Sequence, residues 1–166
     1  MPPSPVLSLA DLPLDTLHDG PVFSARAAPF AAPLGATRLG GRLVEIPPGR
    51  KGWPRHCHHA NDEIFVILSG RGQLRLGDAS WRVAAGDIAV CPAGGAETAH
   101  QLVNDGEEPL RYLAISTMNA PDVMEYPDSG KIMVLAGSAP GGDKAKRSLS
   151  FIGRLEDQPG YWDGEA

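Results

Sequence analysis

Short hydrophobic runs, separated by turn-forming residues, characterise the chain from residue 39 to residue 117. The runs are rich in Val, Ile, Leu and aromatic residues, and the gaps contain Gly, Pro, Asn or Asp, which favour chain reversal. Strands of an all-β jelly roll or barrel show this spacing. The pattern predicts these strands: Leu39–Ile46, Trp53–His58, Glu63–Leu68, Gln73–Leu76, Ser80–Val83, Ile88–Cys91, Ala99–Val103 and Leu110–Ser116.

The pattern is weaker on either side of this region. Residues 1–37 are rich in proline and show little periodicity, which predicts an irregular arm over the domain with one short strand near residues 22–25. Residues 38–117 are expected to form a single jelly-roll β-barrel, and residues 118–166 a C-terminal extension that packs on it. The extension is expected to contain a strand at Lys131–Ala136 and to be anchored by Phe151, Tyr161 and Trp162.

Length, composition and charge narrow the class of protein. A chain of 166 residues is typical of one domain and can bury a hydrophobic core without disulfides. The net charge of −5, without an extended basic run, argues against nucleic-acid binding. No stretch approaches the ~20 apolar residues of a membrane span. Two cysteines are too few for a disulfide framework, so we expect a cytoplasmic protein. Separately, we expect its partner to be a small molecule.

Three of the five histidines stand within four residues, in the stretch HCHHANDE at 56–63. Alternate residues of a strand point to the same side, so His56 and His58 share one face. The turn-forming residues 60–62 are predicted to return the chain antiparallel, which would let Glu63 face the same pair. Imidazole and carboxylate groups suit a divalent transition metal. His100, which opens another apolar strand, is the best candidate for a fourth ligand.

Other residues with similar chemistry have simpler interpretations. His18 and His59 are interpreted as packed or surface histidines. Asp62 is better explained as a turn residue than as a ligand. Cys57 and Cys91 are interpreted as small packed hydrophobic residues.

Two blocks of the sequence resemble the paired motifs of the cupin superfamily. The first motif, G(x)5HxH(x)3–4E(x)6G, matches His56, His58, Glu63 and Gly70, although its leading glycine is offset because position 50 is Arg. The second motif, G(x)5PxG(x)2H(x)3N, matches Gly86, Pro92, Gly94, His100 and Asn104. Its loop is longer here, with five residues between Gly94 and His100, and Glu97 occupies the usual histidine position.

The resemblance extends beyond these blocks and implies both a fold and a centre. The stretches EYPDSGK at 125–131 and YWDGE at 161–165 resemble a group of small bacterial single-domain cupins. The resemblance implies a conical β-barrel that holds one divalent metal, Fe, Mn, Ni or Zn, and homodimers are common in the superfamily. The implied ligands are His56, His58, Glu63 and His100, with Glu97 as a weaker alternative to His100.

Four protein ligands leave positions on such a metal for water, dioxygen or a chelating substrate. We therefore expect a metal-dependent enzyme that acts on a small polar or acidic metabolite. Dioxygenase-like and sugar-isomerase-like chemistry are both open. The alternative is a non-catalytic module that binds a small ligand or a metal.

Strand alternation also suggests which residues surround a substrate. Arg38 and Arg42 share a face of the first barrel strand, and an inward face would favour an acidic substrate, but we expect exposure on the outer sheet. The residues expected to line the pocket are Trp53, Phe65, Ile67 and Leu102.

Overall fold

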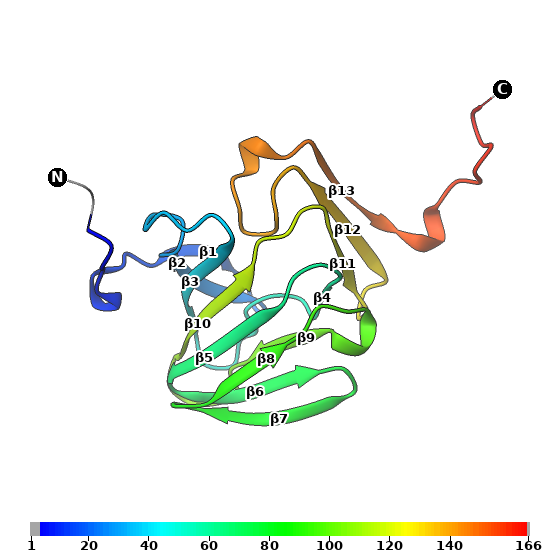
Figure 1. Cartoon of the computed structure of the whole chain (residues 1–166). Helices are drawn as coiled ribbons and strands as arrows, with labels where there is room; N and C mark the ends of the chain where they lie inside the picture. The colour runs from blue at the N-terminus through cyan, green and yellow to red at the C-terminus, as the bar shows by residue number, and fades with distance from the viewer. Residues whose placement is uncertain (1–3, 166) are drawn as a thin grey trace.

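The computed structural model describes residues 4–165 as thirteen strands and four short 3-10 helices (Figure 1). The strands form three sheets in which every pairing of named strands is antiparallel. None of the described helices has the length and apolar character needed to cross a lipid bilayer. The helices are η1 Leu9–Asp11, η2 Ala96–Thr98, η3 Lys144–Lys146 and η4 Leu155–Asp157.

Each sheet combines segments that are distant in the sequence. The six-stranded sheet contains, in spatial order, β1 Asp15–Asp19, β2 Ser24–Pro29, β3 Leu39–Ile46, β10 Leu110–Thr117, β5 Glu63–Ser69 and β8 Ile88–Cys91. The four-stranded sheet contains β13 Leu149–Arg154, β12 Lys131–Ala136, β11 Asp122–Tyr126 and β4 Cys57–His58. The three-stranded sheet contains β7 Ala79–Ala84, β6 Arg71–Leu76 and β9 His100–Val103.

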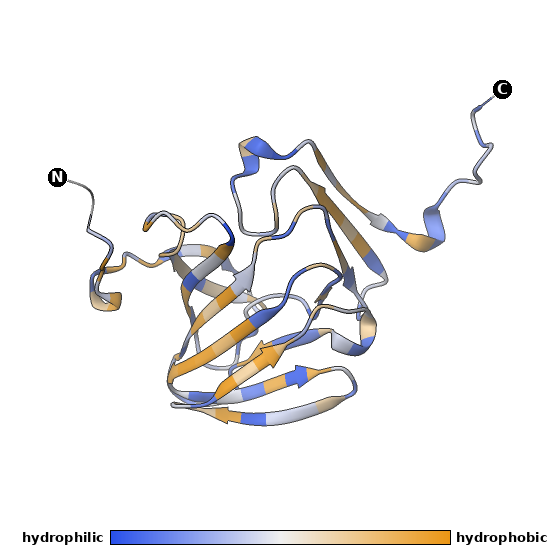
Figure 2. Ribbon diagram, in the orientation of Figure 1, coloured by the Kyte–Doolittle hydropathy of each residue, from blue (hydrophilic) through white to orange (hydrophobic). Residues whose placement is uncertain are grey.

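The hydrophobic core lies between the six-stranded and the three-stranded sheets. Val44 of β3, Phe65 of β5 and Tyr112 of β10 contribute from the larger sheet, and Leu74 of β6 and Leu102 of β9 contribute from the smaller one. Hydrophobic residues are concentrated on β5, β8 and β10 (Figure 2). Burial of alternate side chains on both sheets stabilises the barrel and confirms the predicted all-β jelly roll.

The predicted strands are present, with one large error in length. The predictions for Leu39–Ile46, Ile88–Cys91 and Lys131–Ala136 agree with β3, β8 and β12 to the residue. The predicted strand Trp53–His58 is wrong over most of its length, because only Cys57–His58 is a regular strand. Pro54 has no N–H to donate and fixes φ, so the chain enters β4 through irregular backbone.

The predicted hairpin between the histidine pair and Glu63 is also wrong. β4 pairs with β11, whereas β5 pairs with β8 and β10. Asn61 explains the difference, because its Nδ2 donates to the Asn119 carbonyl at 3.0 Å and its Oδ1 accepts from the Asn119 N–H at 2.7 Å. The turn-forming residues therefore bind the connection between β10 and β11 and carry the chain from one sheet to another.

The N-terminal segment is more regular than its proline content predicts. β1 and β2 extend the six-stranded sheet beyond β3, and β2 begins two residues later than the strand expected at 22–25. Small side chains explain the close pairing, since Ala25, Ala27 and Ala28 of β2 are all buried. Pro29 ends the strand.

The C-terminal aromatic residues do not anchor the chain on the barrel. Tyr161 and Trp162 are 86% and 78% exposed, and Phe151 on the edge strand β13 is 50% exposed. The tail after β13 runs away from the barrel (Figure 1). Tyr161 and Trp162 contact one another edge to face, with ring centroids 4.8 Å apart and ring planes at 85°, instead of packing on the domain as predicted.

The fully buried Asn104 yields a prediction about stability. Its Nδ2 donates to the carbonyls of Ile46 and Glu108 at 2.8 and 2.9 Å, and its Oδ1 accepts from the Gly106 N–H at 3.0 Å. Asn104→Ala leaves these groups unpaired, so it should lower the free energy of unfolding by about 2–4 kcal/mol in denaturant titrations. Glu107→Ala, in the same loop but exposed, should change it by less than about 0.5 kcal/mol. Equal stability of the two variants would contradict this assignment.

Candidate metal centre

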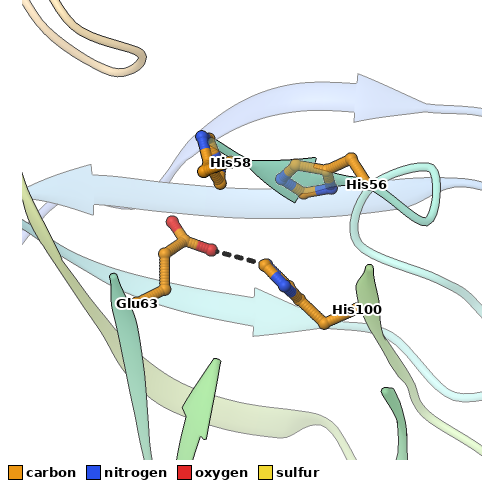
Figure 3. A group of neighbouring side chains, drawn as sticks. All are labelled: His56, His58, Glu63 and His100. Atoms are coloured by element: carbon orange, nitrogen blue, oxygen red, sulfur yellow. Dashed lines mark hydrogen bonds and ion pairs between the residues drawn. The ribbon is translucent and has the colours of Figure 1, made fainter. Parts of the chain in front are cut away.

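Four side chains converge at the place where the three sheets meet (Figure 3). Glu63 is the first residue of β5, His58 ends β4, His100 begins β9, and His56 precedes β4. One ligand atom from each lies within 4.8 Å of those of the other three. The residues predicted from the sequence are therefore brought together, and the group could hold a metal ion.

Backbone hydrogen bonds place the histidines side by side. The His56 N–H donates to the His100 carbonyl at 3.1 Å, and the His100 N–H donates to the His56 carbonyl at 2.8 Å. Residues paired in this way project to the same side, so their imidazoles are neighbours, with centroids 4.9 Å apart. His58 joins them by strand alternation, while Cys57 points to the opposite face, as predicted.

The three imidazoles share one hydrogen-bonding arrangement. In each ring, Nδ1 faces an oxygen that can only accept, so the neutral form of the ring carries its proton on Nδ1 and keeps the Nε2 lone pair for a ligand. Such partners fix both the tautomer and the orientation of a ligating histidine. The pairs are His56 with the Pro54 carbonyl at 2.8 Å, His58 with Asp122 Oδ2 at 2.7 Å, and His100 with the Thr98 carbonyl at 3.2 Å.

The charges in the group also suit a cation. Burial raises the pKa of Glu63, but the hydrogen bond and positive charge from His100, with further charge from His58, outweigh it and lower the pKa to about 2. Burial lowers the pKa of His56 to about 4, and the neighbouring His100 acts in the same direction. At neutral pH the group therefore contains a carboxylate anion beside a neutral His56 imidazole.

One contact tests whether these residues fit a metal. His100 Nε2 lies 2.8 Å from Glu63 Oε2 (Figure 3). When His100 is neutral with its proton on Nδ1, both of these atoms are acceptors, so the pair requires either a proton shared between them or a cation bound to both. Two ligands bound at about 2.1 Å and at right angles lie about 3 Å apart, so the spacing fits coordination.

Asp122 supports this group and was missed by the sequence analysis. It is 1% exposed; besides its contact with His58, its Oδ1 accepts from the Ala60 N–H at 2.9 Å. Burial alone would raise the pKa of Asp122. Hydrogen bonds from His58 and Asn61 have a larger, opposite effect, so the pKa lies below its ordinary value and the carboxylate is ionised at neutral pH. No local pattern reveals this role, because 64 residues separate Asp122 from His58 and only the pairing of β4 with β11 brings them together.

The opposite face of β4 carries the residues that the sequence analysis set apart. His59 is a surface histidine, as expected, and its Nε2 contacts Glu125 Oε1 at 2.6 Å. Cys57 is a buried free thiol beside them. Glu97 lies near this side too: its Oε1 accepts from the Gly95 N–H at 3.0 Å, and backbone hydrogen bonds, with a smaller contribution from His59, lower the pKa of Glu97. The structure therefore does not support Glu97 as a substitute for His100.

A cavity of about 800 Å³ contains the four-residue group in its lining. Trp53, Phe65 and Leu102 also line the cavity, as expected. Ile67 does not, because it is 1% exposed and packs within the core. Strand alternation predicts the correct face of β5, but it does not fix how deep along that face the open space extends.

Arg42 corrects a further expectation. Its side chain lines the cavity, whereas the sequence analysis expected it on the outer sheet; Arg38, before the strand begins, is exposed. Arg42 shares the inner face of β3 with Val44 and Ile46, which belong to the core. The same alternation that buries these residues directs Arg42 inward.

Comparison with known proteins identifies a domain within the chain. Residues 42–116 match the family model described as "Cupin domain". These residues include the whole four-residue group and most of the core strands. Together with the jelly-roll fold, the match shows that residues 42–116 form a cupin domain.

Two solved structures share the fold over nearly the whole chain. One is a sugar phosphate isomerase of the cupin superfamily from Silicibacter pomeroyi, with 22% identity, coverage of 96% of this chain and 98% of that one, and a TM-score of 0.76. The other is a candidate sugar phosphate isomerase from Acidithiobacillus ferrooxidans, with 23% identity, coverage of 93% and 95%, and a TM-score of 0.74.

The curated relatives match over a shorter region. An uncharacterised protein from Methanocaldococcus jannaschii is 36% identical over 61 residues, which cover 37% of this chain and 46% of that protein. The chain spans about half the length of the curated relatives it matches.

The contact between Asp122 and His58 yields a prediction about metal affinity. Asp122→Asn keeps the size of the side chain but weakens its hold on the His58 proton, so it should reduce the affinity for a divalent metal by about 10–100-fold. Competition with a chelating dye measures this affinity. Glu125→Gln is the matched control, because Glu125 lies on the same strand and contacts the outward His59. Equal affinities for Asp122→Asn and the wild type would contradict the role assigned to Asp122.

Proposed function

We propose that this chain is a metal-dependent enzyme that binds one divalent transition metal through His56, His58, Glu63 and His100 and acts on a small polar metabolite. The convergence of these four side chains within a cavity carries the proposal. A volume of about 800 Å³ lies within the range of small-molecule sites.

The donor set limits which metals suit the site. Three nitrogen donors and one carboxylate oxygen favour Mn, Fe, Ni or Zn over cations that prefer oxygen alone. A six-coordinate ion would keep two positions for substrate oxygen atoms, where it would polarise a carbonyl or hydroxyl group. A single protein carboxylate also leaves the site with net positive charge when a divalent ion is bound.

The residues around the group orient it and restrict water. Tyr126 stacks on His56, with ring centroids 5.9 Å apart, and burial raises the pKa of Tyr126, so its phenol stays protonated at neutral pH. Phe65 contacts the edge of His100, with centroids 5.7 Å apart. The walls of the cavity contain the apolar side chains Met124, Met133 and Leu135. A substrate bound here would be held against a rigid polar centre by a largely apolar wall.

Isomerisation of a hydroxy-carbonyl compound is the reaction that we propose. Such a reaction needs one polarised carbonyl oxygen and the movement of a proton between neighbouring carbons. The description of two neighbours of similar length as sugar phosphate isomerases, one of them as a candidate, supports it.

Metal content tests the ligand assignment. Elemental analysis of natively purified protein should find about one transition-metal equivalent per chain, because the four donors form one site. His58→Ala removes one donor and should reduce the content at least about tenfold. His59→Ala removes a histidine from the outer face and should leave the content unchanged. Wild-type content in His58→Ala would show that the metal, if present, binds elsewhere.

Proton exchange tests the reaction. Metal-loaded protein incubated in D2O with a panel of aldose and ketose phosphates should introduce deuterium next to the carbonyl of its substrate, detected by NMR. Glu63→Gln should slow the exchange by about 100-fold or more, whereas Glu125→Gln should keep the wild-type rate. Oxygen consumption without exchange would establish an oxygenase instead. Tight binding of a panel member without conversion would establish a non-catalytic binding module.

A further inference from the structure

Three cationic side chains line the cavity around the metal centre. Arg42 comes from β3, Lys131 begins β12, and Arg147 follows η3. Within residues 4–165, none of the three forms an ion pair with a carboxylate at 4.0 Å or less. This concentration of positive charge contrasts with the net charge of −5 for the whole chain.

Arg147 carries the clearest sign of a missing partner. Its Nε atom is buried and has no hydrogen-bond partner among the described residues. Arg55 and Arg111 also have buried, unbonded Nε atoms, but their side chains contact Asp128 and Glu45. A buried, charged donor without a partner is unfavourable, so the Arg147 position favours an anion that enters the cavity.

The loop that carries Arg147 lies against Arg42. At Gly141, where φ is +77°, an added Cβ would collide with the Arg42 guanidinium, so backbone and guanidinium are in close contact there. Gly141 and Arg147 belong to the same loop between β12 and β13. The fold thus brings one guanidinium from the six-stranded sheet and one from the C-terminal extension to the lining of the same cavity.

The carboxylates of the cavity have other partners. Glu63 is bound to His100 in the metal centre. Asp143 lines the cavity, but its Oδ1 accepts from the Ala145 N–H at 2.9 Å at the start of η3. Lys131 contacts the Tyr126 ring, with Nζ 5.5 Å from its centroid, and this contact leaves its N–H donors available. The cavity therefore offers three cations to an incoming anion.

We propose that Arg42 and Arg147, with Lys131, form an anion subsite that binds the phosphate group of a phosphorylated metabolite while its other end reaches the metal centre. Two guanidinium groups match a phosphate dianion, since each can donate two parallel hydrogen bonds. That the other end of the metabolite reaches the metal centre rests on the proposed function, whereas binding of the phosphate group by the arginines does not.

Isothermal titration calorimetry of the metal-stripped full chain tests the subsite, with inorganic phosphate and glycerol 3-phosphate as probes and glycerol as the uncharged comparison. Both anions should bind saturably and glycerol should not. Arg147→Gln and Arg42→Gln should each weaken anion binding by at least about tenfold. Lys144→Gln is the control, because Lys144 lies in the same loop but is exposed and does not line the cavity. Unfolding midpoints identify any variant that fails to fold, and Arg147→Lys supplies a milder change at that position.

The outcomes separate this proposal from the metal assignment. His58→Ala, which lacks a proposed metal ligand, should keep wild-type affinity for phosphate. Loss of phosphate binding in His58→Ala together with wild-type binding in both arginine variants would place the anion at the histidines and overturn the subsite. Absence of saturable binding of either anion to the folded wild type would also overturn it. Tighter binding of glycerol 3-phosphate than of inorganic phosphate would identify a phosphate ester, not free phosphate, as the ligand.

Discussion

The antiparallel backbone pair between His56 and His100 is the constraint on which the rest of the centre depends. Its two hydrogen bonds tie the irregular backbone before β4 to the first residue of β9, so the four-stranded and three-stranded sheets meet at this point. Glu63 faces the pair from the six-stranded sheet, and Asp122 holds His58 from β11. Each sheet supplies one side of the centre. Separation of the His56–His100 pair would disperse the donors even if the sheets themselves stayed folded.

Local geometry explains what could be predicted from the sequence. Hydrophobic alternation located the barrel strands, and the same alternation placed His56 and His58 on one face with Cys57 on the other. Alternation did not predict the features that depend on contacts between residues distant in the sequence. Residues 60–62 do bend the chain, but the contacts of Asn61 with Asn119 direct the bend to a different sheet. The contact between Asp122 and His58 is invisible in the sequence for the same reason.

The cavity shows a second limit of sequence reasoning. Alternation identified the inner faces of β5 and β9, but whether a side chain there meets open space or the core depends on the depth of the barrel, as Ile67 shows. Arg42 shows the converse, because it shares the inner face of β3 with the core residue Val44 but lies where that face meets the cavity. The exposed Tyr161 and Trp162 show that aromatic character alone does not predict packing.

The positions of the four donors and of the cavity cations along the chain have a consequence for how proteins with this domain can diverge. Residues 42–116 hold the four donors, whereas Lys131 and Arg147 belong to the segment that follows them. That segment joins the barrel through β4 and β11, and one of its strands also supplies Asp122. The cavity lining can therefore diverge by changes in the later segment while the four-residue group stays constant. Exchange of residues 127–154 between similar proteins, with β11 retained, is a route to a new cavity lining around an unaltered group of four donors.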